Sequence, residues 1–86
     1  MKEHIDYLST LFVGIDIASR VHVVSALDFN EQFYIKMKSV ENTQEGAGLI
    51  EQMISNVLEL NHQFKYVVIG MEATGFWRII FLPATY

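Results

Sequence analysis

The chain has 86 residues, which is enough for one small domain or for part of a larger one. A hydrophobic share of 51% and a charged share of 19% are typical of a globular protein and exclude a disordered one. Because cysteine is absent, disulfides and thiolate metal sites are excluded, and a net charge of −4 argues against a domain that grips nucleic acid by charge alone.

The first residues mix positive and negative charges, and no apolar stretch of the kind found in secretory signals follows them. No apolar run approaches the roughly 20 residues that a membrane-spanning helix needs. We therefore expect a cytoplasmic protein without a membrane segment. Residues 1–10 are expected to be a flexible lead-in, and residues 11–86 to be the folded domain.

Three strands are predicted at the start of the domain. Residues 11–17 are almost continuously apolar, which is typical of a strand buried on both faces, and residues 21–27 are rich in β-branched side chains. Residues 32–38 alternate, which predicts a half-exposed strand with one side formed by Phe33, Ile35 and Met37. The tight connections between these segments predict an antiparallel meander.

A helix is predicted to follow. It begins near residues 42–45, where Asn42 and Glu45 resemble a capping box and Thr43 is an alternative cap. Apolar residues then recur at helical spacing until the helix ends near residues 61–62. Gly46 and Gly48 should each weaken it by roughly 1 kcal/mol relative to alanine.

A second buried strand is predicted over residues 66–71, and the first turns of another helix over residues 76–82. The predicted order is thus strand, strand, strand, helix, strand, helix. This is an α/β fold with a mixed sheet, in which the right-handed crossover rule makes strand 66–71 parallel to strand 11–17.

Two acidic residues stand at the ends of the two buried strands. Asp16 ends the first and Glu72 directly follows the last, and each has a glycine two residues earlier, Gly14 and Gly70. Side chains two apart on a strand share a face, so each carboxylate has a gap beside it. If the strands are parallel neighbours, both acids emerge at one sheet edge, where oxygen ligands suit Mg²⁺. The alternative interpretation is structural, with Asp16 forming a turn and Glu72 starting a helix.

Three segments carry a resemblance to a known family. These are residues 13–24 (VGIDIASRVHVV), residues 42–46 (NTQEG) and residues 68–77 (VIGMEATGFW). Their content, order and separation are similar to those of the DEDD-type insertion-sequence transposases of bacteria, which include Piv-type invertases and recombinases that use a bridge RNA. The resemblance covers nearly all of residues 11–82, although residues 82–86 and the Ala18-Ser19 pair depart from the family's pattern.

The resemblance implies a partial RNase H-like (RuvC-like) catalytic domain, incomplete at its C-terminus. It implies that Asp16 and Glu72 are catalytic residues that bind Mg²⁺, and that the full-length protein cleaves and rejoins DNA, with a structured RNA as a further partner in some members. It also implies that two more aspartates and a serine-bearing domain lie beyond residue 86. We expect the 86-residue fragment to be inactive by itself.

Two rival functions stay open. A nucleotide-binding domain of the actin or sugar-kinase type also begins with a strand that ends in aspartate, although its phosphate-binding turn usually contains glycine. The other rival is a truncated remnant that only folds and self-associates as a homo-oligomer.

Further residues have both a structural and a functional interpretation. His22 either packs in the fold or assists the metal. Thr74 and Gly75 either shape a turn or approach a phosphate. Phe76 and Trp77 either pack on the sheet or stack on bases.

Overall fold

The computed structural model describes residues 6–84. In chain order, the elements are η1 (Tyr7–Ser9), β1 (Thr10–Asp16), β2 (Val21–Leu27), β3 (Phe33–Glu41), α1 (Gln44–Leu60), β4 (Tyr66–Ala73) and β5 (Phe76–Pro83). Half of the expected lead-in, residues 1–5, lies outside the described residues. The rest forms the short 3-10 helix η1, and Thr10 is already the first residue of β1 and fully buried.

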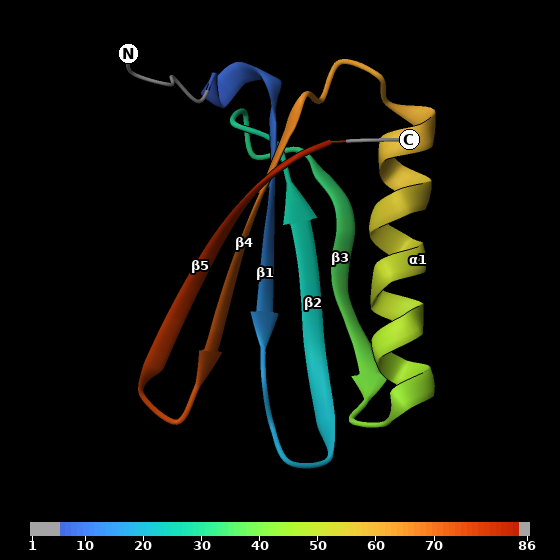
Figure 1. Cartoon of the computed structure of the whole chain (residues 1–86), viewed down its shortest axis with the longest axis vertical. Helices are drawn as coiled ribbons and strands as arrows, with labels where there is room; N and C mark the ends of the chain where they lie inside the picture. The colour runs from blue at the N-terminus through green and yellow to red at the C-terminus, as the bar shows by residue number, and fades with distance from the viewer. Residues whose placement is uncertain (1–5, 85–86) are drawn as a thin grey trace.

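The described strands form one mixed sheet with the order β3-β2-β1-β4-β5 (Figure 1). β1 pairs antiparallel with β2, and β2 antiparallel with β3, so the predicted meander is confirmed. β4 pairs parallel with β1, as predicted from the crossover through the helix. The predicted α/β class with a mixed sheet is therefore confirmed for these elements.

The prediction of a helix over residues 76–82 is wrong, because these residues form β5, antiparallel to β4. Thr74 and Gly75 have φ values of 50° and 86°, which is the left-handed conformation that a two-residue hairpin turn requires. A run of aromatic and β-branched residues follows the turn and suits a strand. The turn residues thus send the chain back along β4 instead of into a helix.

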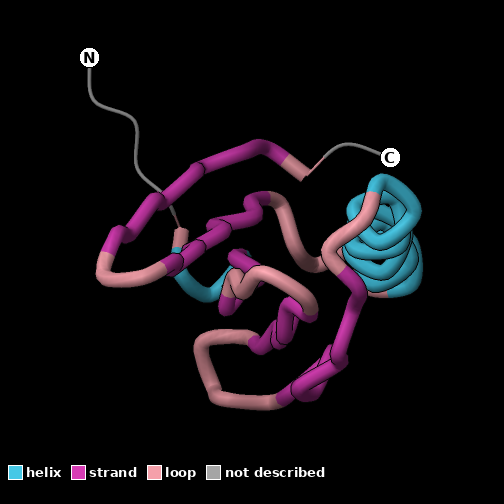
Figure 2. Tube along the Cα trace, turned by 90° about the horizontal axis from the view of Figure 1, so that it is seen from below, coloured by secondary structure: helices cyan, strands magenta, loops and turns pink. Residues whose placement is uncertain are grey.

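The hydrophobic core lies on one face of the sheet, beneath α1, and Figure 2 shows the helix on one side of the curved sheet. Alternate residues of the inner strands reach this face, and the end of α1 and the loop after it complete the core: Leu11, Val13, Val24, Ala26, Ile35, Val40, Val57, Leu58, Phe64 and Val67. No helix within residues 6–84 has the length and apolar character needed to span a membrane.

The opposite face of the sheet is covered by the described residues only at one end, where Tyr7 of η1 stacks on Phe12 with ring centroids 6.2 Å apart. Because the helix does not cover it, we call it the open face. Its residues alternate with the core residues along each strand, as the pleat of a strand requires. They include Phe12, Gly14 and Asp16 of β1, Val23, Ser25 and Leu27 of β2, Val68, Gly70 and Glu72 of β4, and Trp77, Ile79 and Phe81 of β5.

The predicted alternation of β3 is wrong in one respect, because Ile35 is buried in the core while Phe33 and Met37 are exposed. The register between β2 and β3 shifts twice, so β3 carries extra residues opposite β2. Met37 has a φ of 48°, and its backbone N–H donates to Oγ of Ser25 at 3.0 Å. The bulges therefore turn Phe33 and Met37 away from Ile35.

One of the extra residues, Tyr34, joins the core. Its ring meets that of Phe64 edge-on at 5.2 Å, and its hydroxyl donates to Asp28 at 3.2 Å. Burial, reinforced by the charge of Asp28, raises the pKa of Tyr34 above its usual value. The bulged strand is thereby tied to the turn that precedes it.

Of the two candidate caps for α1, Thr43 is the cap, because its Oγ1 accepts from the backbone N–H of Gly46 at 3.0 Å. Asn42 instead donates its side-chain amide to the carbonyl oxygen of Ser19 at 3.1 Å, and its backbone N–H to that of Arg20 at 2.9 Å. Asn42 therefore ties the start of the helix to the loop that follows β1.

Gly46 is required where α1 begins, because a Cβ at this position would overlap the carbonyl oxygen of Glu41. Gly48, two residues further on, has open space around it. We predict that Gly46→Ala destabilises the protein by about 2 kcal/mol, since the first turn must shift, whereas Gly48→Ala stabilises it by up to about 1 kcal/mol. Urea denaturation followed by circular dichroism measures both, and equal effects of the two substitutions would contradict this account of Gly46.

Candidate functional site

The two predicted acidic residues lie side by side. In the parallel pairing of β1 with β4, Asp16 is the direct partner of Glu72, and Gly14 is the direct partner of Gly70. The backbone N–H of Ile17 donates to the carbonyl oxygen of Glu72 at 2.9 Å, which fixes the two strand ends together. Neighbouring strands are about 4.8 Å apart, so the two carboxylates are within reach of one ion and its water shell.

Both carboxylates project from the open face, where they border a shallow depression of about 520 Å³. Directly paired residues form rows across the sheet. One row consists of Val23, Asp16, Glu72 and Trp77, and the next of Ser25, Gly14, Gly70 and Ile79. The small side chains at the centre of the second row create the gap that the sequence predicted beside each acid.

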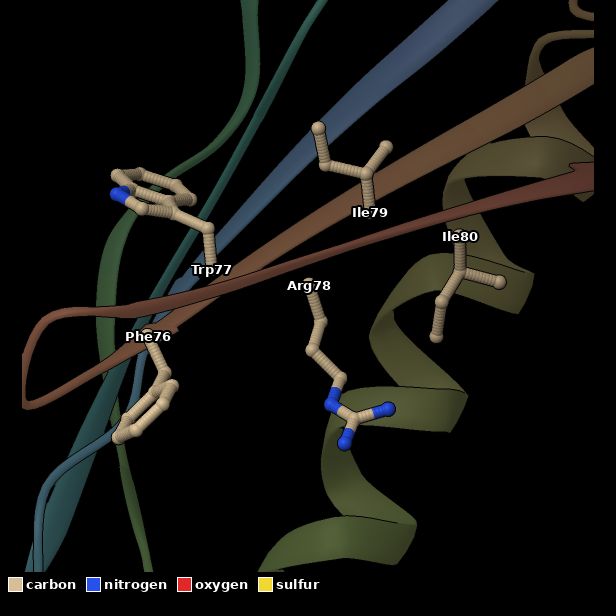
Figure 3. A pocket seen from close by; sticks show the side chains of 5 residues that line it. All are labelled: Phe76, Trp77, Arg78, Ile79 and Ile80. Carbon is tan, nitrogen blue, oxygen red and sulfur yellow. The ribbon is translucent and has the colours of Figure 1, made fainter.

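The charges around the site leave the two carboxylates uncompensated by the described protein. Within residues 6–84, neither Asp16 nor Glu72 takes part in an ion pair or a side-chain hydrogen bond. Arg78 is the direct partner of Met71 and therefore lies on the other face of the sheet from Glu72. Figure 3 shows its side chain pointing away from those of Trp77 and Ile79. Two like charges this close favour a cation between them.

The described residues contain no group of three or more acidic, histidine or cysteine side chains placed to hold a metal. The site therefore offers two carboxylates. Mg²⁺ accepts such a set because it keeps several water ligands and is often bound by one or two protein carboxylates together with substrate phosphates.

His22 does not belong to this site. It alternates with Val23, so it lies on the opposite face of the sheet from Asp16. Its Nδ1 accepts from the backbone N–H of Ala18 at 3.2 Å, which closes the loop after β1. Of the two interpretations of His22, the structure supports the structural one.

One residue of the site, Ser25 of β2, which pairs with Gly14, was not identified from the sequence. Trp77 was identified as a residue that packs or stacks, but its pairing with Glu72 was not predicted. Residues 76–82 were expected to form a helix, and in a hairpin closed by Thr74 and Gly75 the residue opposite Glu72 is Trp77. Phe76 and Trp77 were expected to pack on the sheet or to stack on bases. Both are exposed in the structure, with exposed fractions of 79% and 66%.

Comparison of the chain with known protein families, with curated proteins and with solved structures finds no match. The resemblance to the transposases therefore stays a prediction made from the three segments of sequence.

The structure gives Gly14 no role in folding, because a Cβ there would meet no atom within 4 Å and its φ is not in the left-handed region. We predict that Gly14→Val stabilises the fold by up to about 1 kcal/mol, since valine favours strands. Gly75→Val, the control, should destabilise it, because Gly75 has a φ of 86°. Thermal unfolding of both variants measures this, and a destabilised Gly14→Val protein would show that Gly14 serves the fold instead of the site.

Proposed function

We propose that this chain contributes two carboxylates, Asp16 and Glu72, to the magnesium site of a DEDD-type DNA transposase whose catalytic domain is RNase H-like. The observation that supports this most is the direct pairing of the two acids on an uncovered face of the sheet. A purely structural pair of acids has no reason to lie side by side without compensating charge. The transposase resemblance supplies the reaction class.

In this proposal, Asp16 and Glu72 hold the ion through their carboxylate oxygens, and the bound ion supplies charge stabilisation for phosphodiester cleavage in the full-length protein. The backbone hydrogen bond between Ile17 and Glu72 holds together the two strand ends that carry these carboxylates. The gap over Gly14 and Gly70 leaves room for a DNA strand beside the ion. The remaining ligands would come from the aspartates that the resemblance places beyond residue 86, so the fragment alone should not cleave DNA.

The structure favours this proposal over the nucleotide-binding rival. A phosphate-binding turn after Asp16 needs free backbone N–H groups. The N–H of Ile17 donates to Glu72, and that of Ala18 donates to His22. The loop also directs the carbonyl oxygens of Ser19 and Arg20 toward Asn42. Saturable binding of ATP by the full-length protein would support the rival instead.

Metal binding can be tested on the chain itself with Mn²⁺, a paramagnetic substitute for Mg²⁺. Millimolar Mn²⁺ should broaden the amide signals of residues 15–17 and 71–73, with a dissociation constant on the order of 1 mM. Asp16→Asn and Glu72→Gln should each abolish this broadening. Glu45→Gln, which removes an acid near the start of α1, is the matched control and should leave it unchanged. Broadening that follows Glu45, or that survives both substitutions, would contradict the proposed site.

Catalysis can be tested in the full-length protein that contains this chain. Asp16→Asn or Glu72→Gln should lower the rate of Mg²⁺-dependent DNA strand cleavage by about 10²–10³-fold, because each removes a ligand that stabilises charge in the transition state. DNA binding, measured by fluorescence anisotropy, should stay within a few-fold of the parent. Cleavage at the parental rate in either variant would refute the assignment of that residue.

A further inference from the structure

β5 (Phe76–Pro83) has a free edge. Within residues 6–84 it pairs with β4 on one side and with no strand on the other, and all eight of its residues are exposed. An exposed, apolar edge strand presents unpaired backbone groups that favour pairing with another strand. The opposite edge, β3, lacks this character because it is bulged and carries Lys36 and Lys38, which are features that block such pairing.

The pairing with β4 determines which backbone groups of β5 point outward. Ala73 and Phe76 close a two-residue hairpin, and the backbone N–H of Ala84 donates to the carbonyl oxygen of Lys65 at 2.9 Å. The even-numbered residues of β5 therefore bond to β4. Trp77, Ile79 and Phe81 direct their backbone N–H and C=O groups to the free edge. Pro83 also faces this edge, but it has no N–H to donate.

We propose that β5 pairs antiparallel with β5 of a second copy of this chain, around a two-fold axis at Ile79. In this register Ile79 faces the partner's Ile79, and Trp77 faces the partner's Phe81. In this register the three outward residues that have an N–H form about six backbone hydrogen bonds in all with the partner strand, and Pro83 is not required to donate one. The two sheets join into one continuous sheet, and the proposal does not depend on the metal site.

The side chains of β5 suit this self-pairing. On the open face, two Trp–Phe cross-strand pairs flank the Ile79 pair, and such aromatic pairs stabilise sheets. Arg78, the one charged residue of β5, faces the partner's Ile80, so no like charges are opposed. A strand with one charge and apolar residues on both faces fits an identical strand better than a charged partner.

The exposed area is in the range that a weak dimer needs. Phe76, Trp77 and Phe81 have exposed fractions of 79%, 66% and 57%. At 150–250 Å² for a whole aromatic side chain, the three expose on the order of 400 Å². Phe76 lies on the opposite face of the sheet from Trp77 and Phe81, so this area is divided between two faces, and it is below the roughly 800 Å² per partner of a stable interface. We therefore expect a dimer with a dissociation constant in the micromolar range.

The register can be read by disulfide cross-linking, because the chain has no cysteine of its own. Ile79→Cys places two thiols opposite each other at a hydrogen-bonded pair, where Cα atoms are about 5.5 Å apart and a disulfide can form. Phe81→Cys is the matched control, since its partner copy would lie four residues away along the strand. Mild oxidation should give a covalent dimer of Ile79→Cys and leave Phe81→Cys monomeric. Cross-linking of both variants to the same extent, or of neither, would overturn the proposal.

Sedimentation equilibrium over a micromolar to millimolar range tests the association without cross-links. The parent chain should be a reversible dimer, and Ile79→Lys should weaken it at least tenfold by opposing two like charges at the axis. Met37→Lys changes the open face on β3, the other edge strand of the sheet, and should leave the dimer intact. A parent chain that stays monomeric throughout, or a dimer lost equally in Met37→Lys, would overturn pairing through β5. The latter result would indicate that two open faces pack together.

Discussion

The parallel pairing of β1 with β4 is the constraint on which the candidate site depends. Each of these strands has a small residue, then an apolar residue, then an acid, and the pairing sets the two triplets in register. A shift by one residue would turn Asp16 and Glu72 to opposite faces of the sheet. The hydrogen bond from Ile17 to Glu72 fixes the register at the position where the acids stand. The burial of Val13 and Val67 beneath the helix fixes it along the rest of the pair.

The division of the sheet into a covered face and an open face explains why acids are tolerated there. The helix and the loop after it bury the apolar residues of one face, including the fully buried Leu11 and Phe64. Asp16 is exposed on the other face, so its carboxylate stays hydrated and its desolvation free energy is small. The same openness leaves apolar side chains such as Trp77 and Ile79 exposed. The two acids and these exposed apolar side chains therefore lie on one face of the sheet.

The sequence predicted the secondary structure correctly wherever the pattern was local. Apolar runs identified β1 and β4, spacing identified α1, and the crossover rule predicted their parallel pairing, from which the neighbourhood of Asp16 and Glu72 follows. It failed where the outcome depended on backbone geometry that residue types do not reveal. Thr74 adopts a left-handed conformation unusual for threonine, which made a hairpin look like the start of a helix. The bulges of β3 likewise cannot be recognised from its alternating sequence, so Met37 was predicted on the wrong face of the sheet.

The pairing can be measured directly by NMR, because a hydrogen bond transmits a scalar coupling between its donor nitrogen and the carbonyl carbon that accepts. A long-range HNCO spectrum of the uniformly labelled chain reports which carbonyl accepts from the amide of Ile17. The account predicts a cross-peak between the Ile17 nitrogen and the carbonyl carbon of Glu72. A cross-peak to any other residue of β4, or an Ile17 amide that exchanges freely with solvent, would mean that Asp16 and Glu72 are not held together.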